Sequence, residues 1–147
     1  MSHDHWRDYH TRWSKLRPPL RPAPEVATAI RALVAGRPGP ALLLGVTPEL
    51  ADVAADVTAV DRSEAMIGAI WPGDGPGRRA VRGDWRSLPF EDAGFACAVG
   101  DGSLNAVTHP GDHAAVWAEL GRVLRPGGRV VVRVFARPED AGSVASV

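Results

Sequence analysis

The chain has 147 residues, of which 45% are hydrophobic and 23% charged, and its 17 basic side chains balance 17 acidic ones. These are the proportions of one globular domain with its own core, and they exclude wholesale disorder. Without net charge, with no apolar run near the roughly 18 residues of a membrane span and with no signal-peptide pattern, the chain is expected to be cytoplasmic, with neither nucleic acid nor membrane as partner.

The first segment differs in character from the rest of the chain. Trp6, Tyr9 and Trp13 recur at helical spacing and predict an aromatic stripe along one helix face. Prolines over residues 18–22 end that helix, and a second amphipathic helix is expected over residues 25–34. We expect the stripe to pack onto the domain, with the alternative that it also roofs a ligand site.

Five apolar runs then alternate with helical patterns. They cover residues 41–45, 57–60, 80–82, 95–99 and 129–135. Helix starts are expected at Thr47-Pro48 and Ser63-Glu64, and a longer helix is expected over residues 112–124, ended by residues 125–128. Strands that alternate with helices indicate crossover connections, so we predict an α/β domain with a doubly wound, mostly parallel sheet.

The residues that suggest chemistry lie at the ends of these strands, where ligands bind in open parallel sheets. Gly45 follows the first strand and would let a ligand approach the backbone. Asp61 follows the second, and its carboxylate can accept hydrogen bonds from both hydroxyls of a ribose. Gly83-Asp84-Trp85 follows the third, where Asp84 can accept from an adenine amine and Trp85 can contact the base. For any one aspartate, helix capping is the alternative.

Cysteine and histidine carry little signal. Cys97 lies in an apolar run with no flanking cation, so we interpret it as a core residue rather than a nucleophile. His3, His5 and His10 crowd one terminus and are interpreted as a solvated helix end. No metal site is predicted, because no group of ligand-type residues has metal-binding spacing.

Taken in order, these motifs resemble those of class I S-adenosylmethionine-dependent methyltransferases, over about residues 41–135. The motifs are the strand ending at Gly45, Val60-Asp61-Arg62-Ser63 with Met66, Gly83-Asp84 with Leu88-Pro89-Phe90, and LGRVLRPGG from Leu120 to Gly128. The resemblance implies a sheet ordered 3-2-1-4-5, S-adenosylmethionine across the ends of the first three strands, and methyl transfer to a small-molecule acceptor by proximity and in-line displacement. A helical cap segment (1–36) would precede the cofactor-binding core (37–147).

By this resemblance, Asp61 binds the ribose, Asp84 binds the adenine amine, and residues 101–103 face the methionine end and the acceptor. The implied cofactor site comprises Gly45, Thr47, Asp61, Arg62, Met66, Gly83, Asp84, Trp85, Asp101, Gly102 and Ser103.

The loop after the first strand departs from the family pattern, which is a glycine-rich turn with an acid two residues before its first glycine. Here that acid is replaced by Leu43, and the later glycines are missing from Val46-Thr47-Pro48. The methionine carboxylate then needs another partner. Arg21 is a candidate, because a guanidinium can bind a carboxylate through two hydrogen bonds; a solvated surface arginine is the alternative.

A second departure is length, since the family's usual sixth and seventh strands have no counterpart before Val147. The strand over residues 129–135 would then be an open edge, which natural proteins seldom leave uncovered. Either a homodimer forms through this fifth-strand edge, or the chain is part of something longer.

No catalytic residue is assigned. Asp101, Asn105 and His109 are the candidate bases, and a base is needed only if the acceptor must lose a proton early. Two alternatives to the enzyme stay open. One is a catalytically weak or inactive methyltransferase-like module that binds cofactor or partners. The other is a nicotinamide-dependent oxidoreductase, against which the missing G-x-G-x-x-G motif argues.

Overall fold

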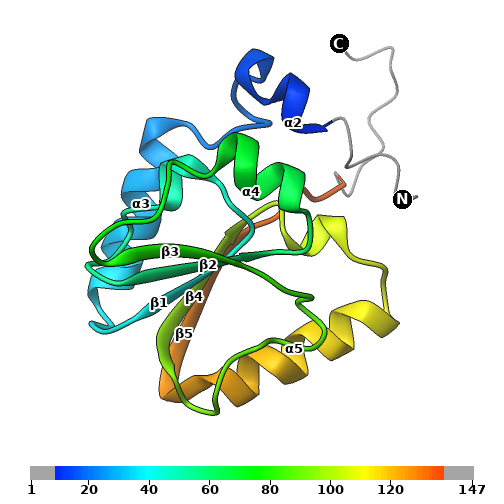
Figure 1. The fold of residues 1–147 in the computed structure, drawn as a ribbon. Coiled ribbons are helices and arrows are strands. Elements are labelled where there is room, and N and C mark those ends of the chain that lie inside the picture. Colours follow the sequence, from blue (N-terminus) through cyan, green and yellow to red (C-terminus); the bar gives the residue numbers. More distant parts are fainter. Residues whose placement is uncertain (1–8, 138–147) are drawn as a thin grey trace.

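The structure, a computed structural model, describes residues 9–137 and is built around a five-stranded parallel sheet in the order β3-β2-β1-β4-β5 (Figure 1). The strands are β1 (Ala41–Leu44), β2 (Val57–Asp61), β3 (Arg78–Arg82), β4 (Phe95–Asp101) and β5 (Leu124–Arg133). The predicted α/β class and the implied strand order are confirmed. Since β2 and β4 flank β1, the order of the strands reverses there, and this is the switch point where ligands bind in open sheets.

Helices cover both faces of the sheet (Figure 1). They are α2 (Tyr9–Arg12), η1 (Trp13–Lys15), α3 (Pro24–Ala35), η2 (Pro48–Leu50), α4 (Glu64–Ile70), η3 (Leu104–Ala106) and α5 (Gly111–Val123). Alternate side chains of β1 supply two cores: Ala41 and Leu43 pack with α3 and α4, whereas Leu42 and Leu44 pack with α5. Within residues 9–137, none of the helices is long and apolar enough to cross a bilayer.

Several predicted elements are confirmed, for the physical reasons that predicted them. Ser63 caps α4 by accepting a hydrogen bond from the Met66 amide at 3.2 Å. The amphipathic helix α3 buries Ile30 and Val34 against the sheet. Cys97 is fully buried in the middle of β4, as expected of a core residue.

Two element predictions were wrong. Thr47-Pro48 opens only the single turn η2, and residues 51–56 form turns and bends rather than a longer helix before β2 begins at Val57. The fifth strand begins at Leu124, immediately after α5, and not at residue 129. It ends at Arg133, so that Phe135 lies beyond it. The irregular pairing between β4 and β5 explains why the glycine-rich turn falls inside the strand.

Some predictions remain untested. Trp6 and the Tyr9 side chain lie outside the described part of the chain, so the aromatic stripe is represented by Trp13 alone. Among the described residues, β5 has β4 as its one neighbour, and the homodimer through its other edge stays a prediction. The division into a cap segment and a core likewise stays a prediction.

Candidate functional site

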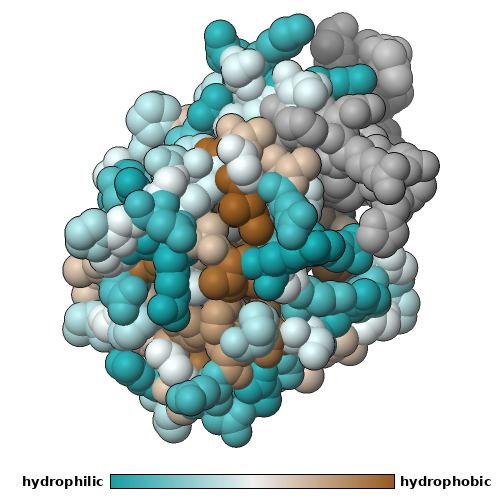
Figure 2. Space-filling model, viewed as in Figure 1, coloured by the Kyte–Doolittle hydropathy of each residue, from teal (hydrophilic) through white to brown (hydrophobic). Residues whose placement is uncertain are grey.

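A cleft with two connected lobes runs along the carboxyl ends of the strands. The outer lobe has a volume of about 710 Å³. It is lined by Asp61, Arg62, Asp84 and Trp85 from the ends of β2 and β3, and by Asn105 and Asp112 from the chain after β4. Around the inner lobe, of about 290 Å³, stand Trp13, Gly45, Thr47, Asp101, Gly102 and Phe135. Asp61, Met66 and Trp85 line both lobes, which therefore form one cleft of the size that holds cofactors. Figure 2 shows a band of apolar side chains through the middle of the visible face, between hydrophilic ones.

Asp61 lies at the junction of the two lobes. Its Oδ1 accepts a hydrogen bond from the Ser63 amide at 2.8 Å, and its Oδ2 lies 4.0 Å from where a Cβ on Gly45 would be. Burial raises the pKa of this carboxyl above its ordinary value, although the Ser63 amide and the charge of Arg62 act in the opposite direction. The carboxylate is therefore incompletely compensated, and hydroxyl donors from a ligand would stabilise its charge.

Gly45 and Trp85 are fixed beside Asp61 through one backbone carbonyl. The Val60 oxygen accepts from the Gly45 amide at 2.8 Å and from the Trp85 indole Nε1 at 2.9 Å. The backbone of Gly45 has φ +102°, a conformation that residues other than glycine rarely adopt. The ring of Trp85 thus forms a wall of both lobes directly next to the first-strand loop.

Asp84 lines the outer lobe, but its carboxylate already has a partner. Arg86 donates to it from its backbone amide at 2.9 Å and from Nη2 at 2.7 Å, and Arg86 also reaches Asp112 across the lobe at 3.4 Å. Hydrogen bonds from the Arg86 side chain lower the pKa of Asp84 to about 2. An adenine amine at Asp84 would have to share this carboxylate with Arg86.

Arg86→Gln is expected to raise the pKa of Asp84 from about 2 toward the ordinary value of about 3.9, because the bidentate charged donor is lost. The shift would be measured by following the Asp84 carboxyl in an NMR pH titration. Arg82→Gln is the control, since Arg82 pairs with Glu64. An Asp84 pKa that stays near 2 in Arg86→Gln would contradict the assignment of Arg86 as the cause.

The residues at the end of β4 and directly after it are held mainly by the neighbouring strands β5 and β1. Asp101 lines the inner lobe, but its carboxylate is paired with Arg133, whose Nη2 lies 2.9 Å from Oδ2. Gly102 also lines this lobe, with φ +69°. Ser103 is buried, and its hydroxyl donates to the Leu44 carbonyl at 2.7 Å rather than facing either lobe.

The other residues of the implied site divide into two groups. Thr47 lines the inner lobe, Arg62 lines the outer lobe, and Met66 lines both. Gly83 lines neither lobe, because it packs against the second core: a Cβ there would lie 2.9 Å from Val60 Cγ2. The sequence motif placed Gly83 beside the site, but the structure gives it a packing role.

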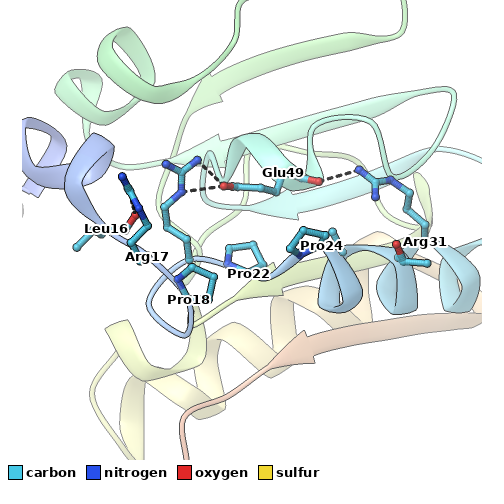
Figure 3. Close-up of a pocket in the computed structure, with 10 residues that line it drawn as sticks. Leu16, Arg17, Pro18, Pro22, Pro24, Arg31 and Glu49 are labelled. Atoms are coloured by element: carbon cyan, nitrogen blue, oxygen red, sulfur yellow. Dashed lines mark hydrogen bonds and ion pairs between the residues drawn. The ribbon is translucent and has the colours of Figure 1, made fainter.

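Arg21 lies outside the cleft, in a separate depression of about 460 Å³ that Leu16, Arg31 and Glu49 also line (Figure 3). Its Nε donates to Glu49 Oε1 at 2.8 Å, and its guanidinium stacks over the Trp13 ring at 5.0 Å. Figure 3 shows Arg31 reaching the backbone of the same Glu49 from the other side. Glu49 is therefore the carboxylate that Arg21 binds here. The predicted role of Arg21 in binding a methionine carboxylate stays a prediction.

Sequence reasoning missed part of the site. Arg86 and Asp112, which bridge the outer lobe, were not anticipated, although Arg86 lies only two residues after Asp84. Phe135 was expected at the end of the fifth strand, on the side of the sheet where ligands bind, but no role was assigned to it, and it lines the inner lobe. Trp13 lines the inner lobe, which agrees with the alternative that the aromatic stripe roofs a ligand site.

Of the candidate bases, Asn105 lines both lobes and Asp101 is ion-paired. His109 is exposed and lines neither lobe; its ring contacts that of His113 edge-on, at 5.3 Å between centroids. Within residues 9–137 there is no group of three or more side chains that could hold a metal ion.

Comparisons with known proteins place this cleft in a broader context. The family model described as "Methyltransferase domain" matches residues 44–132, which include every strand from the end of β1 to β5. The demethylmenaquinone methyltransferase of Mycolicibacterium vanbaalenii is 42% identical over 95 residues, which are 64% of this chain and 39% of that protein. The ubiquinone/menaquinone biosynthesis C-methyltransferase of Hahella chejuensis is 35% identical over 91 residues, covering 62% of this chain and 34% of that protein.

A solved structure of a Pyrococcus horikoshii protein superposes with a TM-score of 0.71 at 24% identity, covering 95% of this chain and 65% of that one. This likeness supports the fold. The chain spans about two fifths of the length of the curated relatives that it matches.

Proposed function

Because the chain belongs to the class I family of S-adenosylmethionine-dependent methyltransferases, we propose that its cleft binds S-adenosylmethionine and that it transfers the methyl group to a small-molecule acceptor. The observation that carries the proposal is Asp61 at the junction of the two lobes, a partly compensated carboxylate beside the close-approach glycine of the first loop.

The residues of the cleft fit this cofactor. Asp61 can accept hydrogen bonds from the ribose hydroxyls, which would supply further donors to this partly buried carboxylate. The outer lobe would then hold adenine against Trp85 and next to Asp84, and the inner lobe would hold the methionine end near Gly45 and Thr47. Among the residues that the structure describes, we assign none to the methionine carboxylate.

S-adenosylmethionine supplies a methyl group on a sulfonium, which leaves as a neutral thioether. The protein's own contribution is then to hold the acceptor in line and to exclude water. Trp13, Phe135 and the buried Met66 line the inner lobe, and their apolar side chains would exclude water from it. Among the cleft residues, Asp101 is ion-paired and none is assigned as a base, so proximity would supply most of the acceleration.

For the acceptor, a small molecule is supported by the absence of net charge and by the narrow inner lobe. Two curated relatives carry names of quinone-biosynthesis methyltransferases. We extend this only to the class of acceptor: a small molecule rather than a nucleic acid.

A second candidate is a methyltransferase-like module that is weakly active or inactive. It is supported by Asp84 and Asp101, whose carboxylates are engaged by Arg86 and Arg133 instead of facing the cleft freely. Cofactor affinity and turnover distinguish the two candidates, because a module of this kind would show binding without transfer, or neither.

Calorimetric titration with S-adenosylhomocysteine, and separately with NADH, tests the proposal. We expect S-adenosylhomocysteine to bind at one site per chain and NADH not to bind, because the first-strand loop has no dinucleotide fingerprint. Absence of S-adenosylhomocysteine binding to the folded protein would contradict the proposed function. NADH binding of similar strength would favour the oxidoreductase alternative.

A further inference from the structure

Asn105 makes an unusual pair of hydrogen bonds with the backbone beyond β5. Its Nδ2 donates to the Phe135 carbonyl at 2.9 Å, and its Oδ1 accepts from the Phe135 amide at 2.9 Å. One side-chain amide thus satisfies both backbone groups of a residue that no strand pairs, in the way that a neighbouring strand would. Asn105 therefore fixes the position of Phe135.

The ring of Phe135 is held on two further sides. A Cβ on Gly102 would lie only 3.1 Å from Phe135 Cε2, so the ring packs directly onto the glycine backbone. The guanidinium of Arg133 lies 4.9 Å from the ring centroid. Despite these contacts, 42% of Phe135 is exposed, and it faces the inner lobe.

Other apolar side chains meet Phe135 at this lobe. Leu20, which is 55% exposed, and Trp13 line the lobe from the N-terminal segment. Arg133 ties this segment down by donating to the Pro19 carbonyl at 2.7 Å. Exposed apolar side chains that gather in a cleft mark a surface for an apolar ligand.

Among the described residues, the inner lobe offers no free charged partner to an acceptor once a ribose occupies Asp61. Two acidic side chains line this lobe: Asp61, which the proposed function assigns to the ribose, and Asp101, which is ion-paired with Arg133. In the part of the chain that the structure describes, the inner lobe is lined by no basic side chain that could bind an anion. A charged acceptor would therefore lose its hydration without gaining a partner.

We propose that Phe135, positioned by Asn105, forms the acceptor-binding wall of the inner lobe, and that the acceptor is an uncharged, planar aromatic ring that stacks on it. This proposal rests on the proposed function, because it places the acceptor next to the methionine end of the cofactor. Phe135 is the specificity-determining residue, and Asn105 is a positioning residue that acts through it.

The test uses protein saturated with S-adenosylhomocysteine and three probes of similar size, titrated calorimetrically. 2-Naphthol is planar and uncharged, 2-naphthoate is planar and anionic, and 2-decalol is uncharged but not planar. We expect 2-naphthol to bind at least 10-fold more tightly than either of the other two. Equal affinities for the three probes, or preference for 2-naphthoate, would overturn the proposal.

Variants locate the site. Phe135→Ala is expected to weaken 2-naphthol binding at least 10-fold, whereas Val134→Ala is the matched control, since Val134 is an equally exposed apolar neighbour that does not line the lobe. Asn105→Ala should weaken binding about 5-fold in the wild-type background and have no further effect in Phe135→Ala, because a residue that acts through the ring is non-additive with its removal. Additive effects would show that Asn105 does not act through Phe135.

The two proposals fail separately in this design. If S-adenosylhomocysteine binds but 2-naphthol shows no selectivity, or is unaffected by Phe135→Ala, the acceptor wall is wrong and the proposed function stands. If S-adenosylhomocysteine does not bind to folded protein, the proposed function fails first, and the acceptor wall fails with it.

Discussion

Asp61→Asn is expected to lower the affinity for S-adenosylhomocysteine about 100-fold, because two charge-assisted hydrogen bonds to ribose hydroxyls become neutral ones. The substitution keeps the side-chain oxygen that accepts from the Ser63 amide, so the loop after β2 should not change. Asp52→Asn is the matched control: Asp52 is an exposed acid that pairs with Arg31 outside the cleft, and its variant should bind within about twofold of wild type. Dissociation constants from calorimetry measure both.

The same carboxyl should make cofactor affinity depend on pH. Burial raises the Asp61 pKa in the free protein, and hydroxyl donors from a bound ribose would stabilise the ionised form and lower it. Affinity is therefore greatest above the free-protein pKa and falls as the pH drops through it toward the pKa of the complex. Asp61→Asn should abolish this dependence, and a wild-type dependence that persists unchanged in the variant would assign it to another group.

Removal of the Asp61 charge should not cost stability. The folded-state pKa of this acid is raised above the unfolded value, so ionisation disfavours folding above the folded-state pKa, and this penalty disappears below the unfolded-state pKa. At pH 7 the cofactor-free Asp61→Asn protein should therefore unfold at the same temperature as wild type or at a higher one. A large decrease would mean that the affinity loss reports unfolding rather than a lost ribose contact.

The fold could be predicted largely because its signals are local. Short apolar runs ended by glycine or aspartate predicted four of the strands near their observed positions, and Ser63 predicted the start of α4. The errors came from tertiary constraints. The helix start at Thr47-Pro48 gives a single turn, and residues 51–56 turn and bend toward β2 instead of continuing it. Pairing with Phe95 draws Leu124 into β5 before the glycine-rich turn.

In the candidate site, the positions of the acidic residues could be predicted, but the residues that they pair with could not. Strand ends predicted that Asp61, Asp84 and Asp101 lie along one edge of the sheet, and the structure places them there. Which cations bind Asp84 and Asp101 could not be predicted, since Arg86 and Arg133 reach them through folding and not through a spacing that marks an ion pair. Phe135 was expected at the end of the fifth strand, but its role was missed, because nothing in the sequence indicates that Asn105 binds its backbone.

The second large effect is expected from Arg133→Ala, which leaves the Asp101 carboxylate without its cation. The Asp101 side chain is only 3% exposed, and a buried charge without its partner typically costs roughly 3–5 kcal/mol in the free energy of unfolding. Arg86→Ala breaks a comparable pair whose side chains are 43% and 37% exposed, and it should cost less than about 1 kcal/mol. Urea unfolding at pH 7 measures both.

Replacing both Asp101 and Arg133 distinguishes the cost of an unpaired Asp101 charge from the cost of the packing that Arg133 provides. Asp101→Asn combined with Arg133→Met should recover most of the stability lost in Arg133→Ala, because no unpaired charge remains and the longer side chain can still pack against Phe135. If the double variant is as unstable as Arg133→Ala, the cost lies in lost packing and not in the charge of Asp101. Even when stable, the double variant lacks the hydrogen bond from Arg133 to the Pro19 carbonyl. Weaker 2-naphthol binding by that stable protein would therefore measure what Arg133 contributes to the acceptor wall through its tie to Pro19 and its contact with the Phe135 ring together.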